Sequence, residues 1–208
     1  MKPRAIIFDW SGTISNDMML AYKTNMRLLK DFDKPQMSFE QWKEFAYAGS
    51  AYGFLANLGV QADREKVFEL SARYIDEEVA AGTLPIIYPW AGETIRNVRQ
   101  KCRTAVLSSH PQGHLEQDAE RYKIKKYFDH IRGGCRDKAR YIPVVCKKLG
   151  ATVENTWYVG DEAADIIAAR AAGAFPVAVS GGYSTRERLK AENPALLLDS
   201  ISDLMLII

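Results

Sequence analysis

The sequence has few of the features that mark secreted, membrane-embedded or nucleic-acid-binding proteins. It contains only three cysteines among 208 residues, and they lack the spacing of a metal site. A small, odd number of cysteines argues against a disulfide framework and is typical of a reducing cytosol. No apolar run approaches the roughly 20 residues of a transmembrane helix, and the apolar run behind the basic N-terminus is too short for a signal peptide. The sequence therefore predicts a cytoplasmic protein without a membrane anchor.

The chain also lacks an excess of positive or of negative charge. The formal net charge is +2, which gives no indication of a nucleic-acid partner or of a membrane surface. The 47% of hydrophobic residues can fill a sizeable core. A chain of this length accommodates one domain that carries a smaller insertion.

Short apolar segments alternate with helical patterns over most of the chain. Residues 5–8 form a continuous apolar run of the kind that is buried in a parallel sheet. This alternation predicts an α/β fold, with a Rossmann-like parallel sheet that is covered by helices on both faces. After residue 85 we expect strands at 104–107, 156–159, 175–179 and 195–198, and helices at 93–101, 113–122, 138–149 and 163–172.

The stretch from residue 15 to residue 82 contains helical patterns and no clear strand pattern. Apolar residues recur there at helical spacing, and Ser38 and Gln41 have the spacing of a capping box. We therefore predict two domains. Residues 1–14 and 83–208 form the α/β core, and residues 15–82 form a small α-helical insertion.

Polar side chains stand where three of the expected strands end. Asp9 follows the first strand, and Ser108 and Ser109 follow the strand at 104–107. Asp161 comes directly after the strand at 156–159, and Asp165 comes one helical turn later. In a parallel α/β sheet, ligands bind at the carboxyl ends of the strands. These residues are therefore the first candidates for a site.

The carboxylates among these residues suggest a site for a phosphate ester. Asp161, together with Glu162 or Asp165, could hold Mg²⁺, which binds through one or two carboxylates plus phosphate and water. A cation there would offset the repulsion between Asp9 and a phosphate dianion, so that the carboxylate could attack phosphorus. The alternative for Asp161 is an ordinary N-cap of the helix that follows.

Two further residues could hold a phosphoryl group. Ser108 could donate its hydroxyl to a phosphoryl oxygen, and Lys138 could neutralise both Asp9 and the phosphate. The alternative for Ser108 is a hydroxyl that caps the next helix. The alternative for Lys138 is a solvated lysine in the first turn of its helix.

Taken together, these segments resemble the haloacid dehalogenase-like superfamily, and its phosphatase-type members in particular. The resemblance extends over nearly all of residues 1–14 and 85–204, and the insertion falls where the family carries a helical cap. Four motifs carry it in the family's order: IIFDWSGT, TAVLSS, Lys138 and WYVGDEAADIIAARAAGA.

The resemblance implies a Mg²⁺-dependent hydrolase that acts on a small phosphorylated molecule. Asp9 would attack phosphorus and become an aspartyl phosphate, and the cap would close over the site and select the substrate. The implied catalytic residues are Asp9, Ser11 and Lys138. The implied phosphate site comprises Trp10, Ser108, Ser109 and Lys138. The implied metal site comprises Asp9, the backbone carbonyl of Ser11, Asp161 and Asp165.

One position departs from the family pattern. Hydrolases of this family usually carry a second aspartate two residues after the nucleophile, where it protonates the leaving group, and this chain has Ser11 there. A serine hydroxyl is a poor general acid and base near neutral pH. We therefore expect slow hydrolysis, or a preference for leaving groups that depart without a proton.

Relatives without that aspartate leave alternatives open. Phosphonoacetaldehyde hydrolases read DWAGT and share Trp10, but they use a cap lysine, and residues 49–53, where we would expect one, contain none. Dehalogenases need no metal, whereas the segment Gly160-Asp161 resembles a metal motif. P-type ATPases have a threonine, but nothing else here indicates a membrane pump. A non-catalytic protein that senses phosphate or binds a partner is the alternative outside enzymes.

Overall fold

The computed structural model describes residues 2–45 and 50–208. Its contacts divide the chain into two compact units, residues 1–16 with 87–208 and residues 17–86. These limits lie two and four residues from the boundaries that the sequence indicates. None of the described helices is both long and apolar enough to span a bilayer.

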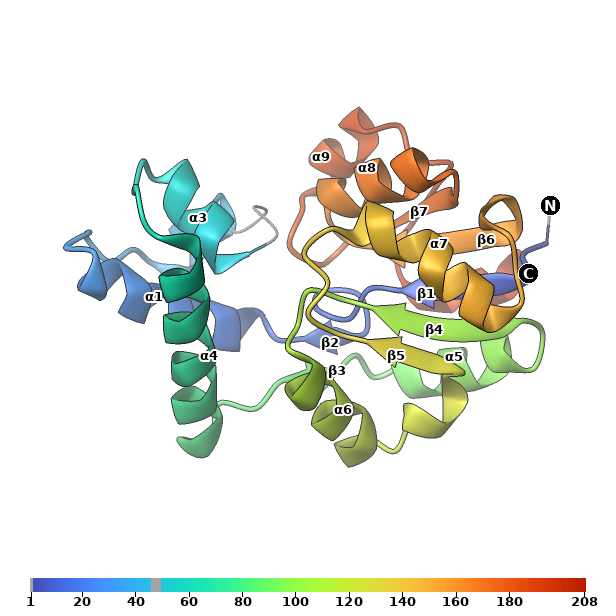
Figure 1. Cartoon of the computed structure of the whole chain (residues 1–208), viewed down its shortest axis with the longest axis horizontal. Coiled ribbons are helices and arrows are strands. Elements are labelled where there is room, and N and C mark those ends of the chain that lie inside the picture. The colour runs from blue at the N-terminus through green and yellow to red at the C-terminus, as the bar shows by residue number, and fades with distance from the viewer. Residues whose placement is uncertain (1, 46–49) are drawn as a thin grey trace. The chain divides into compact units, whose positions relative to one another are not determined.

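The larger unit contains a six-stranded parallel sheet (Figure 1), as the alternating pattern predicted. The order of its strands is β5-β4-β1-β6-β7-β8, so β1 lies in the interior of the sheet. The strands are β1 (Ala5–Phe8), β4 (Arg103–Leu107), β5 (His130–Arg132), β6 (Thr156–Gly160), β7 (Phe175–Val179) and β8 (Leu196–Leu198). The sequence analysis missed β5, since this short edge strand is only half-buried and begins and ends with a polar residue.

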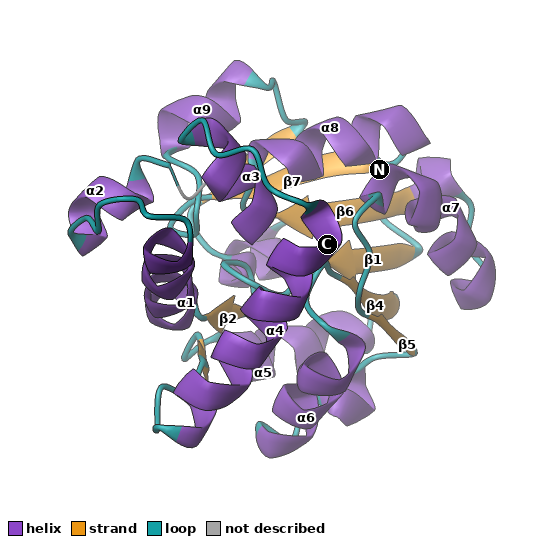
Figure 2. Ribbon diagram, turned by 60° about the vertical axis from the view of Figure 1, so that its left-hand side comes forward, coloured by secondary structure: helices purple, strands orange, loops and turns teal. Residues whose placement is uncertain are grey.

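Helices cover both faces of this sheet (Figure 2). Two of them have the predicted bounds, because glycines in the left-handed conformation end them at Gly150 and Gly173. The last helical element of the chain is a 3₁₀ helix. The elements are α5 (Ala91–Arg99), α6 (Gln112–Arg121), α7 (Lys138–Leu149), α8 (Ala163–Ala172), α9 (Arg186–Ala191), η2 (Lys125–Tyr127), η3 (Val153–Asn155) and η4 (Ile201–Leu206).

The first strand shows why both faces must be covered. Ile6 and Phe8 belong to the core cluster under α5, α6 and η4, whereas Ala5 and Ile7 belong to the cluster under α7 and α8. All four side chains are fully buried. Since successive side chains of a strand point to opposite faces, a strand that is apolar throughout needs a core on each side. The result is a rigid support for the residue that follows it.

The smaller unit is helical, as predicted. Its elements are α1 (Met18–Asp31), α2 (Phe39–Lys43), α3 (Ala51–Asn57) and α4 (Arg64–Ala80), and α1 packs along α4. The chain passes between the two units at residues 16–17 and 86–87. At these positions β2 (Ser15–Asn16) and β3 (Ile86–Ile87) form a two-stranded sheet.

Local signals account for the helix starts in this unit. The predicted capping box is present: Gln41 N–H donates to Ser38 Oγ, and Ser38 N–H donates to Gln41 Oε1. Residues 50–53 begin α3 rather than forming a loop, because Ser50 Oγ caps the helix by accepting from Gly53 N–H at 3.1 Å. Residue 49 lies outside the described residues.

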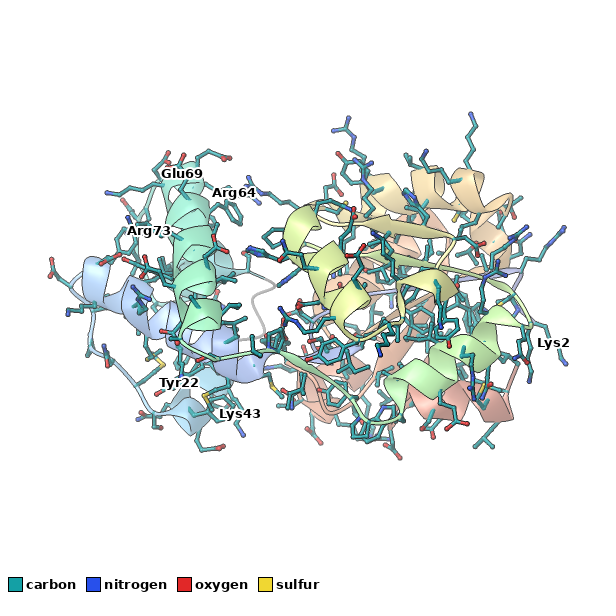
Figure 3. The ribbon with its side chains drawn as sticks, turned by 90° about the horizontal axis from the view of Figure 1, so that it is seen from below. Lys2, Tyr22, Lys43, Arg64, Glu69 and Arg73 are labelled. Atoms are coloured by element: carbon teal, nitrogen blue, oxygen red, sulfur yellow. The ribbon has the colours of Figure 1, made fainter. Side chains whose placement is uncertain are left out.

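Aromatic and cationic side chains pack together in this unit. The ring of Tyr22 meets those of Phe39 and Trp42 edge-on, at centroid distances of 5.4 and 5.7 Å. Figure 3 shows Arg64 and Arg73 along α4, where Arg64 lies 5.5 Å from the ring centroid of Tyr52. The unit therefore has its own apolar and stacked contacts.

Candidate active site

The carboxylates of Asp9 and Asp161 meet because their strands are neighbours. Phe8, the last residue of β1, pairs with Val159 of β6, and Asp9 N–H donates to Val159 O at 2.8 Å. Asp9 is 4% exposed and Asp161 is fully buried. Two acidic groups that the sequence separates by 152 positions thus lie at one desolvated edge of the sheet.

Lys138 lies between two of the candidate carboxylates. Its Nζ is 3.0 Å from Asp9 Oδ1 and 2.6 Å from Asp165 Oδ1. Its side chain is 12% exposed, so the alternative of a solvated lysine is wrong. Burial alone would lower the pKa of Lys138, but the carboxylates of Asp165 and Asp9 raise it well above its usual range. The ammonium is therefore charged near neutral pH.

Both oxygens of Asp161 are fixed in place. Thr13 Oγ1 donates to Oδ1 at 2.7 Å, and Tyr183 N–H donates to Oδ2 at 2.7 Å. The N-cap of α8 is Glu162, which forms a capping box with Asp165, so the alternative of Asp161 as an ordinary N-cap is wrong. The carboxylate of Asp161 is held for another purpose.

Two glycines make room for this carboxylate. A Cβ atom at Gly12 or at Gly182 would lie 2.1 Å from Asp161 Oδ2. Gly12 is also in the left-handed conformation, with φ of 74°. The loop with Gly182 and Tyr183 was not among the predicted site segments; the adjacent glycines at 181 and 182, which begin one residue after the predicted strand at 175–179, were the available signal.

The second expected strand contributes a buried hydroxyl. Ser108 is 1% exposed, and its Oγ accepts from His110 N–H at 3.3 Å, whereas Ser109 is exposed. The N-cap of α6 is Pro111, without a side-chain cap bond, so Ser108 does not cap that helix. Ser108 N–H and C=O are both bonded to the chain segment around β5.

The residues between the nucleophile candidate and Thr13 form a tight turn. The carbonyl of Trp10 accepts from the N–H groups of Ile14 and Ser15 at 2.9 Å each. The ring of Trp10 is fully buried in the core cluster under α5, so its side chain stabilises the turn. Ser11 is half-buried and forms an isolated bridge with Ser15.

The electrostatics of the site fit a divalent cation. Oxygen atoms of Asp9, Asp161 and Asp165 lie within 4.8 Å of one another. Burial raises the pKa of Asp9 to about 6, although Lys138 lowers it. Burial, followed by repulsion from Asp165 and Asp9, raises the pKa of Asp161 well above its usual range. Mg²⁺ is a hard cation that binds oxygen ligands. It would relieve the repulsion among these buried carboxylates, which lie beside the ammonium of Lys138.

Comparisons with known proteins point to one family. Residues 6–179 match the family described as "Haloacid dehalogenase-like hydrolase". A phosphoglycolate phosphatase of Pseudomonas fluorescens is 27% identical over 98% of this chain and 79% of its own length. A second phosphoglycolate phosphatase, from Pseudomonas putida, is 25% identical over the same shares.

Solved structures share the fold. A predicted phosphatase from Clostridium acetobutylicum superposes with a TM-score of 0.83 at 19% identity, over 98% of this chain and 97% of its own. A predicted phosphoglycolate phosphatase from Haemophilus somnus gives a TM-score of 0.78 at 22% identity, over 100% and 98% of the two chains. At these identities, the likeness concerns the fold.

Proposed function

The chain belongs to the haloacid dehalogenase-like hydrolase family, and we propose that it is a Mg²⁺-dependent phosphatase of small phosphate esters with Asp9 as its nucleophile. One observation supports this proposal above all. The carboxylate of Asp9 lies at a buried strand end, 3.0 Å from the Lys138 ammonium and close to Asp161 and Asp165. A carboxylate held among fixed charges in this way is ready to attack an electrophilic phosphorus.

The residues divide the work of phosphoryl transfer among them. Asp9 attacks phosphorus, the bond to the leaving oxygen breaks, and water later hydrolyses the aspartyl phosphate. Lys138 and Ser108 stabilise the charge on the phosphoryl oxygens. Asp9, Asp161, Asp165 and the carbonyl of Ser11 would hold Mg²⁺. When bound, Mg²⁺ supplies positive charge that lets an anionic nucleophile approach an anionic substrate.

The helical unit, residues 17–86, is the part that we assign to substrate selection. It is inserted between the end of β1, which leads to Asp9, and the remainder of the core unit. A lid over a site commonly excludes water and completes the set of catalytic groups. We therefore propose that this unit acts as a cap.

The substrate class follows from the relatives and from Ser11 together. The named relatives are phosphoglycolate phosphatases, so a small phosphorylated carboxylic acid is the first substrate to test. Glycolate leaves as an alkoxide that needs a proton, and Ser11 is a poor donor. We propose that the enzyme hydrolyses such alkyl phosphates slowly and acyl or aryl phosphates faster.

A panel of phosphate esters tests this function. The panel should include phosphoglycolate, acetyl phosphate and an aryl phosphate, each with Mg²⁺ and with an excess of chelator. We expect phosphate release that requires Mg²⁺ and that is lost in Asp9→Asn. Full activity in excess chelator would contradict the proposal and favour dehalogenase-like chemistry. Cleavage of phosphonoacetaldehyde alone would favour the C–P hydrolase alternative.

A further inference from the structure

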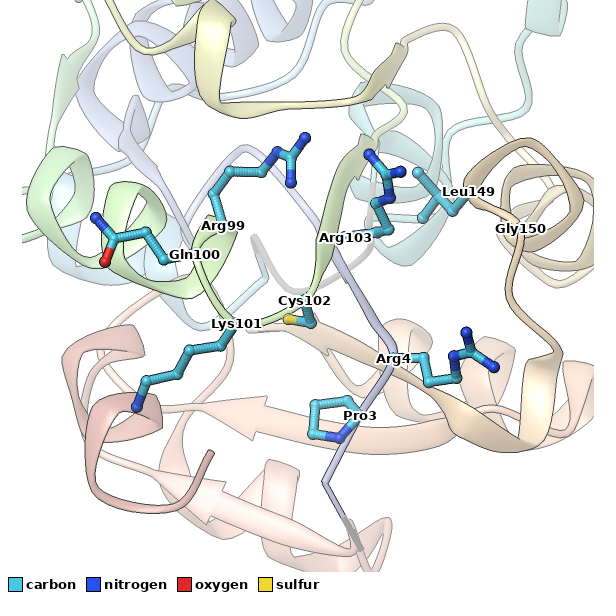
Figure 4. Close-up of a pocket in the computed structure, with 9 residues that line it drawn as sticks. All are labelled: Pro3, Arg4, Arg99, Gln100, Lys101, Cys102, Arg103, Leu149 and Gly150. Carbon is cyan, nitrogen blue, oxygen red and sulfur yellow. The ribbon is translucent and has the colours of Figure 1, made fainter.

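A second site candidate lies at the edge of the sheet opposite Asp9. Arg103 is the first residue of β4, and Ser108 directly follows its last residue, so the two lie at opposite ends of one strand. Five residues of strand span about 17 Å at roughly 3.3 Å per residue. At the Arg103 end is a cavity of about 490 Å³. Figure 4 shows the residues that line it, Pro3, Arg4, Arg99, Gln100, Lys101, Cys102, Arg103, Leu149 and Gly150.

Asp129 orients two of the arginines that line this cavity. Its Oδ1 accepts from Arg99 and from Arg103, at 2.8 Å each, and its Oδ2 accepts from Thr104 N–H at 3.0 Å. Since one carboxylate holds both guanidinium groups, each group keeps further N–H donors for another anion. The two side chains remain 36% and 56% exposed. Asp129 therefore fixes the positions of both guanidinium groups and leaves some of their N–H donors available.

The third arginine that lines the cavity is Arg4. Its backbone pairs with the neighbouring strand, because the carbonyl of Arg4 accepts from Arg103 N–H at 3.0 Å. Within residues 2–45 and 50–208, the structure gives the guanidinium of Arg4 no partner. Lys101, by contrast, points away from the arginines in Figure 4 and donates to the carbonyl of Ile208 at 3.0 Å. Two of the three arginines thus share the carboxylate of Asp129, and Arg4 lines the same cavity.

Helix dipoles do not explain this arrangement. Cations gather at helix C-termini because the last carbonyls carry partial negative charge. That accounts for Arg99, which ends α5. It does not account for Arg4 or Arg103, which belong to the strand side of the cavity rather than to the last turn of a helix. The helix dipole therefore explains only one of the three arginines.

We propose that this cavity binds an organic polyphosphate, such as a nucleoside triphosphate, through Arg4, Arg99 and Arg103. Arginine forks match phosphate oxygens in geometry as well as in charge. The volume falls within the usual range for small-molecule sites, roughly 300–1,000 Å³, and exceeds the need of a single phosphate. Pro3 and Leu149 offer apolar surface to the organic part.

Calorimetric titration of the full chain with ATP in excess chelator tests this site. In the absence of metal, the buried carboxylates around Asp9 repel the ATP anion. ATP binding under these conditions therefore reports on the cavity beside Arg103. We expect ATP to bind the wild type, and its affinity to fall at least tenfold in Arg4→Gln/Arg103→Gln. The matched control is Arg96→Gln, which removes an exposed arginine of α5 outside the cavity. It should change the affinity less than twofold.

Hydrogen exchange then locates the ligand. ATP should protect the backbone of residues 99–104 and leave residues 9–13 unchanged. If the double variant does not fold, Arg4→Gln alone carries the test, since this side chain has no partner among the described residues. No binding to the wild type, equal losses in Arg96→Gln, or protection at residues 9–13 alone would each overturn the proposal. None of these outcomes depends on phosphatase activity, so the two proposals fail separately.

Discussion

A methyl group at position 182 should displace the carboxylate on which the metal site depends. A Cβ atom there would lie 2.1 Å from Asp161 Oδ2, well inside any real contact. The φ of Gly182 lies outside the left-handed region, so alanine fits the backbone and the clash is the main perturbation. The Oδ2 atom of Asp161 must then move by about 1.3 Å, from 2.1 Å to the 3.4 Å at which ordinary contact begins. Its hydrogen bond from Tyr183 N–H would be lost or lengthened.

The size of the effect follows from this displacement. A misplacement of 1 Å in a catalytic site can lower the rate by about 100-fold, which corresponds to about 2.7 kcal/mol of transition-state stabilisation. We expect Gly182→Ala to raise the Mg²⁺ concentration needed for half-maximal activity and to lower kcat/KM by about that factor. Steady-state kinetics across a Mg²⁺ titration measures both quantities.

Gly113→Ala is the matched control. A Cβ atom at Gly113, within α6, would meet no heavy atom within 4 Å, so activity and Mg²⁺ dependence should stay at wild-type values. Wild-type kinetics in a folded Gly182→Ala protein would refute the reasoning. Asp161 would then not need its observed position.

Three further changes test other parts of the site. Ser11→Asp restores a general acid, which typically contributes about 10²- to 10⁴-fold to the rate. It should accelerate phosphoglycolate hydrolysis more than aryl phosphate hydrolysis. Equal acceleration of the two would argue against the role of Ser11. Lys138→Met leaves two buried carboxylates without their counter-charge. In urea unfolding of the metal-free protein, the free energy of unfolding should fall by about 3–5 kcal/mol. The control is Lys147→Met, at an exposed position of the same helix, which should change this free energy little. Burial lowers the pKa of His110 to about 4 from its ordinary value of 6.5. Between these two pH values the unfolded chain binds a proton that the folded chain does not bind. The free energy of unfolding should therefore fall as the pH drops through that window, and His110 accounts for up to about 3 kcal/mol of this fall. In His110→Asn, urea unfolding at pH 7 and at pH 5 should no longer show the part of the difference that is due to this imidazole.

The sequence was most informative where burial leaves little choice of residue. The run from Ala5 to Phe8 is apolar at every position because both faces of β1 are covered, and this run indicated where Asp9 would stand. Helix α8 was bounded correctly because Gly173 ends it in the left-handed conformation. A glycine that ends a helix in the left-handed conformation is a local signal, so a single sequence reveals it, whereas α5 (Ala91–Arg99) lies two residues before its predicted range of 93–101.

Long-range contacts were less accessible. Nothing near Tyr183 in the sequence shows that its N–H meets Asp161, because a backbone donor carries no side-chain signature. The strand β5 was missed because a half-buried edge strand with polar ends lacks an apolar run. Lys138 was ambiguous for a similar reason. Its position at the start of α7 suits solvent or an ion pair, and only the fold brings it to Asp9.

The identity of the nucleophile is the central claim, and trapping the covalent intermediate tests it most directly. The protein with Mg²⁺ is mixed with acetyl phosphate, quenched in acid within one turnover, digested and analysed by mass spectrometry. With Asp9 as the nucleophile, the peptide that contains Asp9 should carry one added phosphoryl group, and the same peptide of Asp9→Asn should carry none. A phosphoryl group on another residue, or phosphate release by wild type and Asp9→Asn alike, would contradict the account.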